Sequence, residues 1–337
     1  MLTDSPGRAM FFFALPMIFG NLFQQFYNIM DSVVVGRFVG EEALAAVGAS
    51  YSVTNVFIAV AIGGGIGSAV MVSQFLGAGQ MEKMKTAIFT TLINFAVLSF
   101  CLGVIGYGLN TEILQWMKTP KNVMKDAAVY LKIYFVGLPF LFMYNVQASV
   151  FNALGDSRTP LYLLIFSSFL NIVLDLVLVC IYHQGVAGVA VATLIAQGVS
   201  AVISFLILLK KVNDYPSAER VPFYDKEMVP GMLKVALPST LQQSIVHVGM
   251  LMVQSVINGF GSSVMAGYAA GTRIESISIV PMLAIGNAMS TFTAQNMGAG
   301  QTNRVRQGYR WSYVMVGGFA LFLCVFLQIF GDLCIMA

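Results

Sequence analysis

Long apolar stretches restrict how this chain can fold more than any other feature. Nine segments carry about 20 or more mostly apolar residues, the length that an α-helix needs to cross the hydrocarbon core of a bilayer. They lie at residues 11–36, 48–76, 86–109, 128–150, 160–182, 186–209, 235–257, 265–293 and 311–331. Only 10% of the residues are charged, against about 25% in soluble domains. The sequence therefore predicts an all-α integral membrane protein, and the continuous runs lack the alternation of a membrane β-barrel.

Short motifs recur in the same order in the two parts of the chain. Ala-Leu-Pro at 14–16 returns at 236–238, and Gly-Ala-Gly-Gln at 77–80 returns at 298–301, so the offsets are 222 and 221 residues. The repeating unit holds six segments, so both copies enter the membrane in the same direction. Parallel repeats of this kind place a transport pathway between two bundles. We therefore predict two pseudo-symmetric six-helix bundles.

The second copy is expected to be incomplete. A proline-containing, mixed-charge segment at 210–234 is typical of a linker, which leaves an N-terminal lobe at 1–209 and a partial second lobe at 235–337. By the repeat offset, Ala337 corresponds to residue 116 of the first copy. We expect about nine of twelve helices to be present, in a C-terminally truncated chain.

The basic residues predict how the chain is oriented. Twelve of the 18 Lys and Arg residues lie in connections on the side of the N-terminus, which favours a cytoplasmic N-terminus in a multi-pass protein of the cell inner (plasma) membrane. The connection at 109–127 argues mildly the other way. A net charge of +3 spread over loops offers no surface for nucleic acid. The four cysteines lack CxxC spacing and a nearby His, so they indicate neither a metal site nor a disulfide framework.

A row of polar side chains interrupts the first apolar segment. Its members recur at steps of three and four, so they would share one face of a helix: Asn21, Gln24, Gln25, Asn28 and Asp31. An ionisable side chain at membrane depth costs roughly 2.5–3.5 kcal/mol on insertion scales and usually faces a protein interior or a water-filled cavity. We interpret Asp31 as the centre of an ion or proton site. The alternative is a carboxylate near the membrane surface, because Arg37 follows six residues later.

A second intramembrane acid lies in the fifth segment. Asn171 and Asp175 are one helical turn apart among apolar neighbours, and Thr193 follows in the sixth segment. Two carboxylates, an amide and a hydroxyl could form an oxygen cage for a hard cation such as Na⁺. The same groups could hold a proton, because a low dielectric and a neighbouring carboxylate favour the protonated form of an acid. For Asn171 and Thr193, a hydrogen bond between helices is the alternative.

Together these motifs resemble those of the multidrug and toxic compound extrusion (MATE) family of cation-coupled efflux transporters, and the resemblance covers essentially the whole chain. The motifs that carry it are the Ala-Leu-Pro opening, Asp-Ser-Val-Val-Val-Gly at 31–36, Ala-Leu-Ala-Ala-Val at 43–47, the two Gly-Ala-Gly-Gln motifs, Ala-Leu-Gly-Asp-Ser-Arg-Thr-Pro at 153–160 and Leu-Asn-Ile-Val-Leu-Asp at 170–175.

The resemblance implies a V-shaped pair of lobes and antiport of Na⁺ or H⁺ against organic, often cationic, compounds. In the bacterial and archaeal branch that couples through its N-terminal lobe, the coupling site matches Asp31, Asn171, Asp175 and Thr193. The proline that matches Pro16 bends the first helix in that branch, which is physically reasonable because an intramembrane proline lacks one backbone hydrogen bond.

The resemblance also implies substrate contacts at Gln24, Tyr27 and Asn145. Another branch relies on an acid in the seventh segment, where this chain instead has Gln242, Gln243, His247 and Gln254, and this difference favours coupling in the N-terminal lobe. We expect no enzymatic activity and no cofactor other than the coupling ion. The expected partners are small organic cations or drugs and the lipid bilayer, with no nucleic acid, and the chain is expected to be a monomer.

Two other functions remain as alternatives. A lipid-linked saccharide flippase of the same superfamily would need basic residues in its cavity to hold a pyrophosphate, and the segments contain almost none. An intramembrane aspartyl protease would need Asp31 and Asp175 to share a proton as a catalytic dyad. Asp175 lacks the Gly-x-Gly-Asp context of that class.

Overall fold

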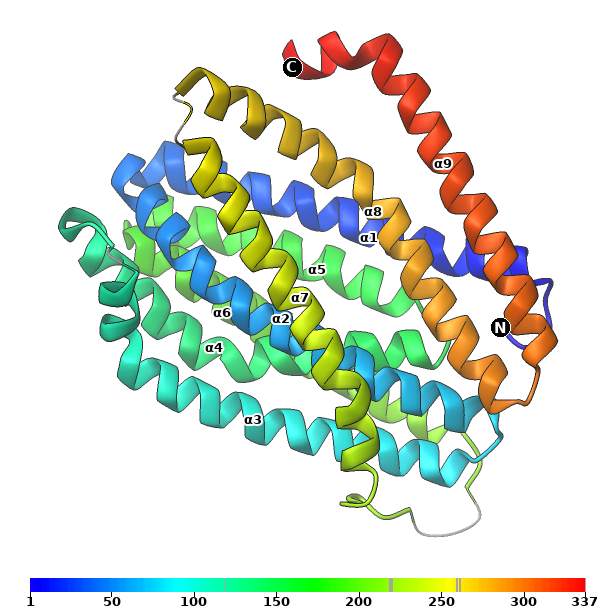
Figure 1. Cartoon of the computed structure of the whole chain (residues 1–337). Helices are drawn as coiled ribbons and strands as arrows, with labels where there is room; N and C mark the ends of the chain where they lie inside the picture. Colours follow the sequence, from blue (N-terminus) through cyan, green and yellow to red (C-terminus); the bar gives the residue numbers. More distant parts are fainter. Residues whose placement is uncertain (118, 218–220, 259, 261, 337) are drawn as a thin grey trace.

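The computed structural model describes residues 1–117, 119–217, 221–258, 260 and 262–336 (Figure 1). Within these ranges the chain forms nine α-helices and two short π-helices, which are marked η. In chain order they are α1 (Pro6–Val34), η1 (Val35–Val39), α2 (Glu41–Gly77), α3 (Met81–Trp116), α4 (Lys121–Ala153), α5 (Arg158–Asp175), η2 (Leu176–Ile181), α6 (Gly185–Asn213), α7 (Val229–Asn258), α8 (Ser262–Gly298) and α9 (Thr302–Met336). The predicted all-α fold is thus confirmed.

Eight helical segments in the described part of the chain are long and apolar enough to cross a membrane. Two of them join an α-helix to a π-helix, at Pro6–Val39 and Arg158–Ile181. The predicted segment at 235–257 forms α7, which does not belong to these eight. It is nevertheless a helix of 30 residues. The chain is therefore a multi-pass membrane protein.

The two Gly-Ala-Gly-Gln motifs fold in the same way. Gly79 and Gly300 both have a φ of +71°, a left-handed conformation that glycine adopts without steric cost. The next residue closes the helix with the long hydrogen bond of a Schellman motif: Gln80 N–H donates to the oxygen of residue 75, and Gln301 N–H to that of residue 296. Each motif therefore ends one long helix, α2 or α8, and starts the next within a few residues.

The densest packing surrounds α4, which lies between α2, α3 and α6. Its phenylalanines Phe135, Phe142 and Phe151 are fully buried in the main core cluster. On α3, a Cβ at Gly106 would lie 2.3 Å from the Phe135 ring, so this glycine lets the two helices approach closely. Small residues at helix contacts are how membrane helices associate, because lipid offers no hydrophobic driving force between them.

Helix α1 has the two faces that its sequence predicts. Phe12, Phe19 and Phe26 are all more than half exposed, as expected for side chains that meet lipid. The polar residues between them, including Gln24, are partly buried. The outer helix α9 also carries many exposed apolar side chains and packs mainly against α8 (Figure 1).

Contacts between helices α1–α6 and helices α7–α9 follow the sequence repeat. Helix α1 packs against α8, and α2 packs against both α7 and α8. In the repeat, α7 corresponds to α1 and α8 to α2, so the α1–α8 and α2–α7 contacts are related by pseudo-symmetry. The connection between α6 and α7 is shorter than the expected 210–234, because α6 continues to Asn213 and α7 begins at Val229.

Candidate coupling site

Two acids from different helices meet inside the α1–α6 bundle. Asp31 lies one turn before the end of α1, and Asp175 is the last residue of α5. Their carboxyl groups lie within hydrogen-bonding reach of each other. Each acid is followed closely by a π-helix. The helices η1 and η2 contact each other, and Val35 and Val179 belong to one buried cluster. Single turns of π-helix are rare and occur often at functional sites.

The acids have no basic partner in the part of the chain that the structure describes, where the ion pair is that of Asp156 with Lys211. Asp175 is 1% exposed, and the Oδ1 atoms of both Asp31 and Asp175 are buried without a hydrogen-bond partner. Two carboxyl groups this close repel each other when both are charged. Either they share a proton, or another cation must lie between them. The geometry is thus that of a site that can take up a cation.

Asn171 and Thr193 lie beside Asp175. In the amide orientation that satisfies both of its ends, Asn171 Nδ2 donates to Asp175 Oδ2 at 2.8 Å. Asn171 Oδ1 then accepts from the Thr193 hydroxyl at 3.3 Å and from the Thr193 backbone N–H at 3.1 Å. This orientation is assigned from the hydrogen-bond network, as is usual for amides. The structure therefore brings together all four residues that the sequence singles out for the site.

Two tyrosines complete the cluster. The Tyr27 hydroxyl lies within hydrogen-bonding reach of Thr193, and the ring is close enough to both acids to sense their charge. Tyr130 of α4 is likewise near Asp31 and Asp175. It also lines a small pocket with Thr193 and Gln197, which has room for about one water molecule. No sequence pattern marks Tyr130, since it belongs to no motif and lies on a different helix from either acid.

The other predicted cavity residues lie farther from the acids. Gln24 Nε2 donates to Asn28 Oδ1 at 3.4 Å on the polar face of α1, which leads to Asp31. The Asn145 side chain instead bonds within its own helix, where its Nδ2 donates to the backbone oxygen of Leu141 at 2.8 Å. It is separated from Tyr130 by about 22 Å along α4, so the structure does not bring Asn145 to the acid cluster.

The remaining predicted residues lie in α1 and α7. Pro16 lies inside α1, which continues through it, and neighbouring Phe13 and Ala14 pack against Ile285 and Ala288 of α8. In α7, Gln242 is exposed and Gln243 is partly exposed. The side chains of His247 and Gln254 lie outside the described residues.

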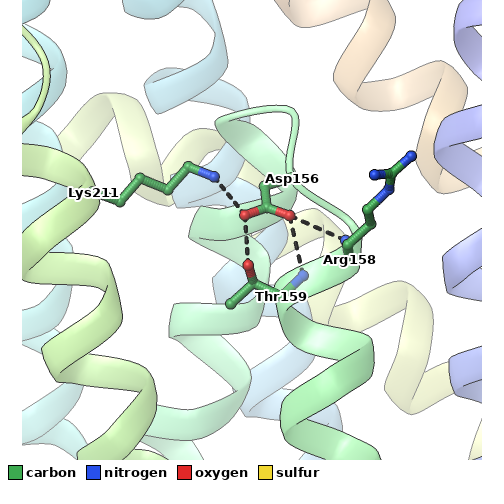
Figure 2. Close-up of polar contacts among 4 residues, drawn as sticks. All are labelled: Asp156, Arg158, Thr159 and Lys211. Carbon is green, nitrogen blue, oxygen red and sulfur yellow. Dashed lines mark hydrogen bonds and ion pairs between the residues drawn. The ribbon is translucent and has the colours of Figure 1, made fainter.

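A polar cluster around Asp156 links the start of α5 to α6 (Figure 2). Asp156 Oδ1 accepts from the backbone N–H groups of Arg158 and Thr159, both at 3.1 Å, as in a helix N-cap. Its Oδ2 accepts from the Thr159 hydroxyl at 2.6 Å and pairs with Lys211 Nζ near the end of α6. Burial alone would raise the pKa of Asp156, but the hydrogen bonds from Lys211 and Thr159 hold it below its ordinary value.

We expect Asp156→Asn to lower the free energy of unfolding by about 1–2 kcal/mol at pH 7, because the charge that Lys211 and the start of α5 stabilise is lost. The native pKa is depressed, so this stability is present above the ordinary carboxyl pKa and is lost as the pH falls through the native one. The apparent Tm of the two proteins in detergent should therefore differ at pH 7 and converge below about pH 4. Asp214→Asn, at an exposed position just after α6, is the matched control. An equal Tm for wild type and Asp156→Asn at pH 7 would contradict this account.

Comparison with known proteins agrees with this architecture. The MatE family model matches residues 16–177 and 238–336. A probable multidrug resistance protein of Bacillus subtilis, YpnP, is 31% identical over 293 residues, which are 87% of this chain and 65% of the relative. Another from the same organism, YoeA, is 31% identical over 329 residues, 95% of this chain and 71% of the relative. The chain thus spans about two thirds of the length of these relatives.

A solved structure described as the outward-facing conformation of a multidrug resistance MATE family transporter of the MOP superfamily superposes with a TM-score of 0.91. It is 25% identical, and the match covers 99% of this chain and 74% of that one. The fold, the repeated motifs and the matched ranges, which together take in more than half of the chain, lead to one assignment: the chain belongs to the MatE family of membrane transporters.

Proposed function

We propose that this protein is a secondary active transporter that exports organic, often cationic, compounds in exchange for Na⁺ or H⁺. The observation that carries the proposal is the contact between Asp31 and Asp175, in which each acid keeps a buried Oδ1 atom without a partner. A buried acceptor of this kind is costly unless something binds it during the working cycle. The names of the relatives, which are given as probable multidrug resistance proteins, support the substrate class.

The donor set fits either coupling ion. Na⁺ takes oxygen ligands, and the carboxylates, the Asn171 amide and the Thr193 hydroxyl supply them. A proton would be held between Asp31 and Asp175, with the Asn171 amide donating to the second acid. In both cases the bound cation removes negative charge from the cavity, which weakens its attraction for an organic cation. Export follows because the two ligands favour different states of the transporter.

Helix α1 is the element that we propose responds to the ion. It carries Asp31 near one end and Pro16 in its interior, where the missing backbone hydrogen bond lowers the cost of bending. Gln24 and Tyr27 lie on the same helix and are proposed to contact the substrate together with Asn145 of α4. Because Tyr27 reaches Thr193, a substrate that displaces the tyrosine would also disturb the ion site.

We also propose an orientation and a state. The surplus of basic residues in connections on the N-terminal side supports a cytoplasmic N-terminus in the plasma membrane, with the chain acting as a monomer. The similar solved transporter is in an outward-facing conformation, which supports the same state for this structure.

Efflux from proteoliposomes under separately imposed gradients tests the proposal. Vesicles that contain the chain and a fluorescent organic cation are given an inward Na⁺ gradient at equal pH, or a pH gradient without Na⁺. One gradient is expected to accelerate efflux by 5- to 150-fold, the usual range of allosteric coupling. Protein-free vesicles control for leakage. Efflux that neither gradient accelerates would refute cation-coupled export.

A further inference from the structure

The two Gly-Ala-Gly-Gln motifs, at 77–80 and 298–301, meet where α2 and α8 end. A Cβ atom on Gly77 would lie 1.9 Å from the backbone oxygen of Gln295, and one on Gly298 would lie 2.0 Å from that of Gln74. Residues 74 and 295 are related by the same offset of 221 as the two glycines. The two contacts are therefore the two halves of one pseudo-symmetric interaction, which only glycine permits at either position.

Hydrogen bonds join further helices at this contact. Gln295 is 4% exposed, and its Nε2 donates to the oxygen of Ala153 at 2.8 Å. The same oxygen accepts from the Ser73 hydroxyl at 3.1 Å. One carbonyl at the end of α4 thus ties α2 to α8, the two helices that carry the paired glycines.

The segment before α1 lies at the same end of the molecule (Figure 1). Arg304, in the first turn of α9, donates from Nε to Asn296 Oδ1 at 3.0 Å. Arg304 Nη2 donates to the backbone oxygens of Met1 and Asp4, at 3.1 and 2.6 Å. The N-terminal segment is therefore bound to the α8–α9 turn beside the glycine contact.

Two more glycines place the rest of this contact surface in the second half of α2. A Cβ on Gly67 would lie 2.5 Å from the backbone nitrogen of Ala236, and one on Gly63 would lie 2.5 Å from the Cα of Thr240. The close backbone contacts between the α1–α6 and α7–α9 helices therefore gather toward the end at Gly77, whereas Asp31 and Asp175 lie toward the other end of their helices.

We propose that Gly77 and Gly298, each seated on the backbone of the opposite helix, form a symmetric gate that closes the transport pathway at the end where the N-terminus lies. This inference rests on the proposed transport function. The contact suits a gate because it joins backbone to backbone. Beside the glycines, Gln295 and Arg304 cross between the two groups of helices through hydrogen bonds, which can break and form again as the helices separate and meet.

A distance measurement tests the gate without requiring transport. Spin labels are attached to cysteines at Gln80 and Gln301, two exposed positions related by the repeat, after Cys101, Cys180, Cys324 and Cys334 have been replaced. Wild type is expected to show one short distance population. Gly77→Ala must move the backbones apart by about 1.5 Å to reach an ordinary contact of 3.4 Å, so it should add a longer population. Gly298→Ala should do the same to a similar extent, and the double variant should shift further.

Matched controls lie in the same two helices. A Cβ on Gly48 of α2 or on Gly286 of α8 would meet no atom within 4 Å, so alanine there should leave the distance unchanged. The gate is refuted if both single variants keep the wild-type distance, or if the control variants shift as much as they do. The two single variants decide the matter even where the double variant does not fold. Longer distances in a chain that shows no cation-driven efflux would support the gate and count against the proposed coupling.

Discussion

Asp31→Asn and Asp175→Asn are each expected to abolish cation-driven efflux while the protein still folds. Asparagine keeps the shape of aspartate, but its amide can neither take up a proton nor supply a negative charge to Na⁺. The bound cation would then no longer distinguish the two states, so the whole coupling factor of 5- to 150-fold should disappear. Efflux rates under the effective gradient, normalised to the amount of reconstituted protein, measure the loss.

The control for this pair is Asp214→Asn, which makes the same chemical change at an exposed position after α6. It is expected to leave efflux at the wild-type rate. When one of the two acids becomes an amide, the other no longer has a carboxylate beside it that repels its charge. The two variants should therefore be at least as stable as wild type. Wild-type efflux in both variants would remove Asp31 and Asp175 from the coupling site, although the fold and the family would stand.

The residue pattern marks each half of the candidate site, and the family resemblance implies that the two halves form one site. Asp31 is conspicuous because a polar row at helical spacing ends in an acid within an apolar segment. Asp175 is conspicuous for the same reason, with Asn171 one turn before it. That the two acids face each other depends on how α1 packs against α5, and hydropathy carries no information about such packing. The place of Tyr130 beside the acids could not be predicted from the sequence, because an aromatic residue in an apolar helix is ordinary.

The π-helices show a second limit. The sequence predicts unbroken helices through 11–36 and 160–182, whereas the structure has η1 and η2 directly after the acids. An α-helix and a π-helix share one hydrophobic pattern over a single turn, so the pattern cannot separate them. The repeated glycine motifs are the opposite case. Their recurrence predicts the pseudo-symmetry, but that Gly77 and Gly298 each touch the opposite helix appears only in three dimensions.

Removing the hydrogen bonds that orient Asp175 is expected to weaken coupling strongly. Asn171→Leu removes the amide that donates to Asp175 Oδ2, and Thr193→Val removes the hydroxyl that donates to Asn171 Oδ1. A buried acceptor left without its donor costs about 1–3 kcal/mol, and 1.4 kcal/mol corresponds to a tenfold change in affinity. Asn171→Leu should therefore raise the concentration of coupling cation that gives half-maximal efflux by about tenfold. Thr193→Val should raise it by less, because Asn171 Oδ1 keeps the backbone N–H of residue 193 as a donor.

The double variant distinguishes a network from two independent contributions. Asn171 and Thr193 act on Asp175 through one chain of hydrogen bonds, so the second substitution should add little once the first is made. Ser168→Ala, at a buried serine of α5 about one turn before Asn171, is the matched control and should leave the cation dependence unchanged. Effects that multiply fully in the double variant would show that the two residues act separately. A serine control as damaging as Asn171→Leu would attribute the loss to helix packing rather than to the ion site.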